Sequence, residues 1–302
     1  VARHWIEGLA GLTCSVEVAS EFRYRNKVVA PNTLFVTISQ SGETADTLAC
    51  LRYSKDIGYL ARLGICNVPT STLARESDLV FLTKAGPEIG VASTKAFTTQ
   101  LVALALLTCS IGVSKKTINK RQEKLIVEGL NRLPGLINET LLQENQIKEL
   151  AASFKDKNSA LFLGRGTMHA IAMEGALKLK EISYIHAEAY PAGELKHGPI
   201  ALIDESMPVI AIAPNDELLG KLKSNLQEVK SRGSQMIVFE DKDSKVKPMK
   251  AMEVIPITSN LGRITAPIIF TIPLQLLSYH VALIKGTDVD KPRNLAKSVT
   301  VE

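Results

Sequence analysis

The stretch "TLFVTISQSGETADTL", residues 33–48, decides the fold. Its first part, Thr33 to Ile38, is a short apolar run rich in β-branched residues, which predicts a strand. Small polar residues follow, and from Ala45 to Ile57 the apolar residues have a helical spacing that ends at Gly58. A strand, a turn and a helix in this order form the repeating unit of α/β proteins. We therefore expect an α/β fold built on a parallel sheet.

The same alternation continues on both sides of a charged middle segment. Further strands are expected at "ARLGIC" (61–66), "DLVFLT" (78–83), "NSALFLGRG" (158–166), "PVIAIAP" (208–214) and "QMIVFE" (235–240). A long helix is expected from about Ser93 to Ile111, and Lys115 to about Glu149 is charged and helical, as in helices that connect domains. We place the first domain, with these connecting helices, at residues 1–140, the second at 141–291 and a C-terminal tail at 292–302.

The two units resemble each other in the order of their elements. A shift of about 174 residues lays Glu7 over Glu181 and Glu21 over Glu194, and superposes the strand at 33–38 on the strand at 208–214. A duplicated α/β domain is the simplest explanation. In this register the strand and turn at Leu161 to Gly166 have their counterparts before Val1, so the first domain is expected to lack its opening strand.

Length and charge restrict the class of protein. A chain of 302 residues suits two domains, because domains usually hold roughly 100 to 200 residues. Hydrophobic residues make up 45% and charged residues 22%, as in globular proteins. The net charge of +5 is small against 36 basic and 31 acidic residues, and no run of basic residues is present. A nucleic-acid partner is therefore not expected.

Cysteines and apolar runs give further expectations. The four cysteines have neither CxxC spacing nor nearby histidine pairs, which favours no metal site, no disulfides and a cytoplasmic setting. The longest uncharged segment, Ala266 to Ile284, is interrupted by Pro267 and Pro273, and Leu101 to Val113 is too short to cross a bilayer. No membrane span and no secretory signal are expected, and the start at Val1 rather than Met suggests a fragment.

The turn "SQSGET" is the first candidate site. A loop between a parallel strand and a helix presents free backbone N–H groups, which together with the helix dipole favour an anion. Ser39, Ser41 and Thr44 add hydroxyl donors, Gly42 allows a close approach, and the absence of Lys distinguishes the loop from a Walker loop. We interpret it as a cradle for the phosphate of a small molecule. The alternative is an ordinary capping box with Ser41 as the N-cap.

A second candidate follows in "EGALKLKEIS" and "HAEAYPAGELKHGP". Glu174, Lys178 and Glu181 share one helix face by their spacing, which is also typical of a solvated stripe of ion pairs. The following stretch, rich in Gly and Pro, is expected to be a loop, and His197 in it is the histidine best placed for proton transfer. The final "KPRNLAKSVTVE" is either a frayed end or, because apolar and basic residues alternate, a docked segment.

These motifs, together with "GPEIGVASTKAFTTQ" and "DVDKPRNLAKSVTVE", closely resemble the isomerase half of the glucosamine-6-phosphate synthase family. The resemblance covers nearly the whole chain. It implies two tandem sugar isomerase (SIS) domains, each a flavodoxin-like parallel sheet flanked by helices. It also implies an enzyme without cofactor or metal that helps to make glucosamine 6-phosphate from fructose 6-phosphate and glutamine-derived ammonia, and interconverts fructose 6-phosphate and glucose 6-phosphate.

The resemblance also assigns roles to residues. It implies that Glu181 moves the proton between C1 and C2, that His197 opens the sugar ring and comes from the partner subunit of a homodimer, and that Lys297 engages the ketone. Lys178 would act beside the reacting carbons. The substrate-binding residues implied are Ser39, Gln40, Ser41 and Thr44 for the phosphate, and Val91, Ser93 and Ala296 for the sugar.

The chain departs from the family in two respects. The N-terminal glutaminase domain of the parent protein is absent, and so is the first strand with its Cys-Gly-Thr-Ser turn, which in the family also contacts the substrate. Two alternative functions share the fold. One is a regulatory SIS module that binds a sugar phosphate without catalysis, which would need the cradle but neither Lys297 nor His197. The other is a deglycosylating or deaminating activity on the same sugar.

Overall fold

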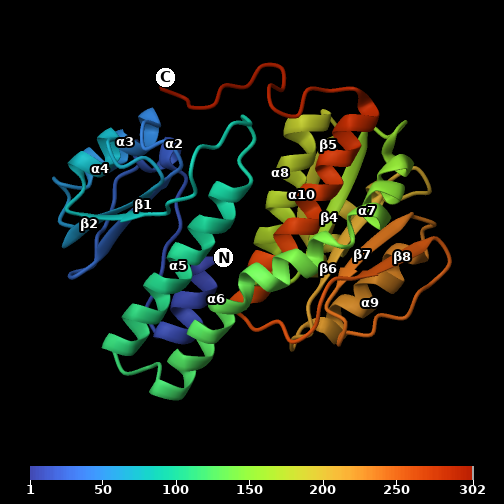
Figure 1. The fold of residues 1–302 in the computed structure, drawn as a ribbon, viewed down its shortest axis with the longest axis horizontal. Helices are drawn as coiled ribbons and strands as arrows, with labels where there is room; N and C mark the ends of the chain where they lie inside the picture. The colour runs from blue at the N-terminus through green and yellow to red at the C-terminus, as the bar shows by residue number, and fades with distance from the viewer. Residues whose placement is uncertain (301–302) are drawn as a thin grey trace.

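The computed structural model describes residues 1–300 of the chain. Two α/β lobes lie on either side of a group of long helices, as Figure 1 shows. The strands are β1 (Leu34–Ser39), β2 (Ala61–Cys66), β3 (Leu79–Leu82), β4 (Ser159–Gly164), β5 (His186–Pro191), β6 (Val209–Ala213), β7 (Met236–Glu240) and β8 (Met252–Pro256). They form a three-stranded sheet in the order β1-β2-β3 and a five-stranded sheet in the order β5-β4-β6-β7-β8. Every pairing is parallel, so the predicted α/β class is confirmed.

The register of the two sheets shows the internal repeat. Leu34 of β1 pairs with Ala61 of β2, and Val209 of β6 pairs with Met236 of β7, so each partner lies 27 residues further along the chain. The strands β1-β2-β3 therefore correspond to β6-β7-β8. In the second sheet β4 and β5 lie beyond β6, whereas within residues 1–300 the first sheet has no strand in those two places.

The helices cover the sheets and connect the lobes. In the first part of the chain they are α1 (Ala2–Trp5), η1 (Ile6–Ala10), α2 (Ala19–Phe22), α3 (Ala45–Tyr53), α4 (Thr72–Glu76), α5 (Lys95–Ser114) and α6 (Lys120–Leu141). In the second part they are α7 (Glu144–Ala151), η2 (Ala152–Phe154), α8 (Thr167–Ser183), η3 (Ala192–His197), η4 (Pro199–Leu202), α9 (Leu219–Lys230) and α10 (Thr265–Lys285). The expected domain boundary at residue 140 falls at the end of α6, and it stays a prediction.

One hydrophobic core joins the two lobes. Helix α10 packs against α8, α7 and α6, and α5 packs against η1. Leu63 of β2, Leu101 of α5, Phe162 of β4 and Phe270 of α10 belong to the same buried cluster. Because this cluster is continuous from the first sheet to the second, α5 and α8 are held in place relative to both sheets.

Two helices are longer than the apolar runs suggested. The segments judged too short or too interrupted for a membrane span lie in α5 and α10, of 20 and 21 residues, which are long and apolar enough to cross a bilayer. In the structure 44% of the apolar window of α5 and 67% of that of α10 are buried inside the protein. Buried core helices of globular proteins have the same length and composition, so two such helices are only weak evidence that the chain spans a membrane.

The prediction of a loop after α8 is wrong for the first part of that segment. Residues His186–Pro191 form β5, the edge strand of the second sheet, and Ala192–His197 continue as η3. A strand at a sheet edge has one solvent side and tolerates polar residues and a terminal proline, so it lacks the apolar signal of the central strands.

Candidate functional site

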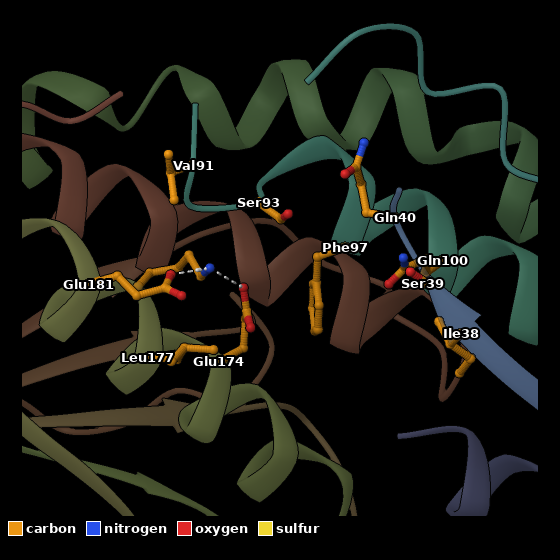
Figure 2. A pocket seen from close by; sticks show the side chains of 11 residues that line it. Ile38, Ser39, Gln40, Val91, Ser93, Phe97, Gln100, Glu174, Leu177 and Glu181 are labelled. Carbon is orange, nitrogen blue, oxygen red and sulfur yellow. Dashed lines mark hydrogen bonds and ion pairs between the residues drawn. The ribbon is translucent and has the colours of Figure 1, made fainter. Parts of the chain in front are cut away.

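A cavity of about 300 Å³ opens between the two lobes. Figure 2 shows the side chains that line it. They come from the end of β1 (Ile38, Ser39 and Gln40), the loop before α5 (Val91 and Ser93), α5 itself (Phe97 and Gln100) and α8 (Glu174, Leu177, Lys178 and Glu181). The cavity thus brings the polar turn after β1 to the same space as the charged face of α8.

The turn after β1 is ordered by its own hydroxyls. The Oγ of Ser39 accepts a hydrogen bond from the backbone N–H of Gly42 at 3.0 Å and lies 3.2 Å from the Oγ1 of Thr44. Gly42 has a φ of +70°, which favours glycine, and a Cβ there would lie 2.2 Å from the Oγ of Ser71. Helix α3 begins after Thr44 as its N-cap, so the alternative of a capping box with Ser41 as N-cap is wrong.

The charged face of α8 points into the cavity. The Nζ of Lys178 lies 2.5 Å from the Oε2 of Glu181 and 3.7 Å from the Oε1 of Glu174. Lys178 is 4% exposed and Glu174 8%, so these residues are not a solvated stripe. Burial raises the pKa of Glu174 to about 7, although Lys178 lowers it; the charge of Glu181 adds to the rise.

The C-terminal tail returns to the first lobe. In Figure 1 it runs from the end of α10 toward α3. The Nζ of Lys297 donates to the backbone oxygen of Gly90 at 2.6 Å, and the Oγ atoms of Ser298 and Ser41 lie 3.0 Å apart. The N–H of Ala45 donates to the backbone oxygen of Val299 at 3.0 Å. A frayed end is therefore excluded for these tail residues.

The environment of Lys297 favours its neutral amine. Desolvation lowers the pKa of Lys297, and the charge of Lys178 lowers it further, while Glu88 and Glu181 act in the opposite direction. The tail does not dock through apolar side chains, since Leu295 is 45% and Val299 57% exposed. Hydrogen bonds to the backbone and to Ser41 hold it instead.

The predicted site residues are not all brought together. Ser39, Gln40, Val91, Ser93, Lys178 and Glu181 line the cavity. Ser41 and Thr44 belong to the same turn without lining the cavity. Ala296 is exposed. His197 is exposed at the end of η3 and does not line the cavity of its own chain.

Sequence reasoning missed several residues of the site. Phe97 and Gln100 lie on α5, and nothing in the helical spacing showed that this face meets the cavity. Glu88 accepts hydrogen bonds from the N–H groups of Thr94 and Ala96, so it caps the start of α5 and shapes the loop that carries Val91. Glu174 was seen in the pattern but not selected, because ion pairs at this spacing are common on helices.

No metal site is found in the described part of the chain. Within residues 1–300 no group of three or more His, Cys, Asp or Glu side chains could hold a metal ion. The four cysteines are free, and Cys50, Cys66 and Cys109 are buried.

Comparisons with known proteins show the family of the chain. The pattern of the SIS domain family matches residues 1–110 and 153–285. The chain is 64% identical over 302 residues to the glutamine–fructose-6-phosphate aminotransferase (isomerizing) of Pseudomonas syringae pv. tomato, covering 100% of this chain and 49% of that protein. The chain therefore spans about half the length of the curated relatives it matches.

Solved structures show the same relationship. The C-terminal domain of glucosamine-fructose-6-phosphate aminotransferase from Francisella tularensis is 56% identical, with a TM-score of 0.94 over 96% of this chain and 81% of that one. A glucosamine-6-phosphate deaminase from Thermotoga maritima, 22% identical with a TM-score of 0.77 over 98% of this chain and 85% of that one, shares the fold alone.

Proposed function

We propose that the chain interconverts fructose 6-phosphate and glucose 6-phosphate. The reason is that it belongs to the SIS domain family and, within it, to the C-terminal domains of the glutamine–fructose-6-phosphate aminotransferases. In the whole protein it would produce glucosamine 6-phosphate with ammonia from an N-terminal glutaminase domain. The names of the relatives support the substrate, and half of their length lies outside this chain.

One observation carries the proposal. The turn after β1 and the charged face of α8 border one cavity of about 300 Å³, which suits a phosphorylated hexose. A phosphate at the turn would meet the hydroxyls of Ser39, Ser41 and Thr44 and the backbone donors before α3. The sugar carbons would then extend toward Lys178 and Glu181.

The proposed chemistry uses one base and one amine. Glu181 takes a proton from C1, the C1–H electron pair forms the C1–C2 double bond, and the ketone electrons move to O2. Glu181 then returns the proton to C2, which leaves an aldehyde at C1 once the O1 proton has moved to O2. Lys297 engages the ketone, Lys178 supplies fixed positive charge near the developing oxyanion, and no cofactor is needed.

Two further parts of the proposal concern assembly and location. His197 does not line the cavity of its own chain, which is consistent with delivery to the site of a partner subunit in a homodimer. It would open the sugar ring as an acid. A cytoplasmic location fits the free cysteines.

The test measures glucose 6-phosphate formed from fructose 6-phosphate by the chain, by Glu181→Gln and by a control variant, Glu253→Gln, in which an exposed carboxylate of β8 is replaced. We expect turnover by the chain and by the control, and its loss in Glu181→Gln with binding retained. Binding of fructose 6-phosphate by the chain without any turnover would favour the regulatory module instead.

A further inference from the structure

Glu174 has no role in the proposed reaction, although it lines the cavity. Its Oε1 is buried and makes no hydrogen bond in the structure. The nearest cation is the Nζ of Lys178 at 3.7 Å, which is beyond hydrogen-bond distance, because this ammonium is bonded to Glu181 at 2.5 Å. The dashed lines that end at Glu174 and Glu181 in Figure 2 mark these two ion pairs. Burying a charged carboxylate without a hydrogen bond costs free energy, so the neutral, protonated form of Glu174 is favoured.

If Glu174, Lys178 and Glu181 are all charged, together they carry one excess negative charge. Glu174 and Glu181 supply two carboxylates, and Lys178 supplies one ammonium. A proton on one carboxyl makes the trio neutral, as for carboxylates that share a buried site. Glu174 is the more buried acid, with a side chain 9% exposed against 22% for Glu181. The proton therefore belongs on Glu174.

Few other charges act on the trio. Lys297 in the tail interacts with Lys178 and Glu181. Helix α5 contributes the uncharged Phe97 and Gln100 to the cavity. On α10, which packs along α8, His280 lies 3.3 Å from Glu144 of α7. Lys285, the last residue of α10, lines a different cavity together with Ser183 and Tyr184 at the end of α8. From the turn after β1, Ser39 and Gln40 add a hydroxyl and an amide to the cavity, while Glu43 accepts a hydrogen bond from the N–H of Thr72.

We propose that Glu174 is a positioning residue whose proton keeps Lys178 bonded to Glu181, and whose ionisation draws Lys178 away and makes Glu181 a stronger base. This inference rests on the proposed isomerisation for its kinetic consequence only. In the neutral form of Glu174, Lys178 holds the Glu181 carboxylate in place. In the ionised form the ammonium is shared between two carboxylates, and the added negative charge favours proton uptake by Glu181.

The kinetic consequence is a step near neutral pH in the dependence of kcat on pH. An acid with a pKa of about 7 is mostly protonated at pH 6 and mostly ionised at pH 8, so its ionised fraction rises about tenfold between these values. We expect kcat for isomerisation to rise across this range, with KM nearly unchanged. Glu174→Gln, which is isosteric and always neutral, should lose the step, and Glu174→Asp should restore it.

A readout that does not depend on activity tests the proposal directly. In protein labelled with ¹³C at the glutamate side-chain carboxyl carbons, one resonance should titrate near neutral pH, and this titration should be missing from Glu174→Gln. The control Glu253→Gln should keep it. If no glutamate carboxyl titrates near neutral pH, or if the titration or the kinetic step persists in Glu174→Gln, the proposal is wrong. A chain that shows the titration without isomerising would refute the proposed function and leave the proton on Glu174 established.

Discussion

The ammonium of Lys297 donates to the backbone oxygen of Gly90 at 2.6 Å, although the two residues are 207 positions apart in the chain. This bond fastens the tail after α10 to the loop that supplies Val91 and Ser93 to the cavity. The cavity is thus lined by α8 from the second half of the chain and by β1, α5 and their loops from the first, and the tail is fastened to one of these loops. Substitutions in these segments should therefore affect the binding of fructose 6-phosphate and its isomerisation, some of them one more than the other.

Thr44→Val should weaken binding of fructose 6-phosphate without unfolding the protein. Thr44 is the N-cap of α3 but its side chain makes no capping bond, and its Oγ1 lies 3.2 Å from the Oγ of Ser39. A lost hydrogen bond to a charged group costs about 1.5 to 3 kcal/mol, which raises Kd about tenfold or more. Calorimetry decides this, with Thr33→Val as a control that removes a hydroxyl bonded to Ala30 outside the cavity. Equal affinities of Thr44→Val and the parent would contradict the phosphate cradle.

Gly42→Ala should destabilise the first lobe and the phosphate cradle together. Alanine would have to adopt a φ of +70°, and its Cβ would lie 2.2 Å from the Oγ of Ser71. The conformation alone costs about 1 to 2 kcal/mol, and the overlap adds to it. Gly220→Ala is the matched control, because Gly220 lies in α9 with nothing near its Cβ position and alanine favours helix there. Thermal unfolding should show a lower Tm only for the first variant.

The fold was largely readable from the sequence, whereas the shape of the site was not. Central strands such as β6, "VIAIA", are buried on both faces and give continuous apolar runs that a pattern can find. The edge strands β5 and β8 mix polar residues and proline with apolar ones, and they were not predicted. The alternation of apolar and basic residues in the tail left a frayed end and a docked segment open. The tail is held by backbone groups and hydroxyls, which no periodicity reports.

Subunits that carry different defects should complement each other if the site is shared in a homodimer. Neither His197→Ala nor Glu181→Gln alone should isomerise, but a mixture that exchanges subunits should recover part of the activity. The reason is that some mixed dimers hold one site with both intact residues. Sedimentation at micromolar concentration tests the dimer itself, and His186→Ala, which changes another exposed histidine, should remain active. Failure of the mixture to recover activity would count against a shared site.

Glu174→Gln should change how stability depends on pH. Because the folded pKa of Glu174 is raised from 4.5 to about 7, the folded state holds this proton more tightly than the unfolded state. The resulting stabilisation is present below about pH 4.5 and is lost as the pH rises through about 7. The free energy of unfolding of the parent should therefore fall, relative to the variant, by up to about 3 kcal/mol across this window. Denaturant titrations at several pH values measure the difference, and a constant difference would contradict the buried acid.

Lys297→Arg should reduce isomerisation far more than it reduces binding of fructose 6-phosphate. Arginine keeps the positive charge and can still bond the oxygen of Gly90, but it lacks an amine that can lose its proton and react. Burial lowers the pKa of Lys297, which raises the neutral fraction of its amine at a given pH. This amine can attack C2 and form an imine, with the ketone oxygen leaving as water. Because isomerisation keeps that oxygen as O2, the imine lies off its path and reverts by hydrolysis, and borohydride would reduce it to a stable amine that marks Lys297 at the ketone.

The adduct gives the sharper measurement. After treatment with fructose 6-phosphate and borohydride, mass spectrometry of the C-terminal peptide should find the sugar on Lys297 and none in the arginine variant. Lys291→Arg is the matched control, because Lys291 is exposed in the same segment and should leave both turnover and labelling unchanged. Near-normal turnover of Lys297→Arg, together with an unlabelled peptide in the parent, would mean that the bond to Gly90 only anchors the tail. The ketone would then have to be engaged by another group, with Lys178 the cation already at the cavity.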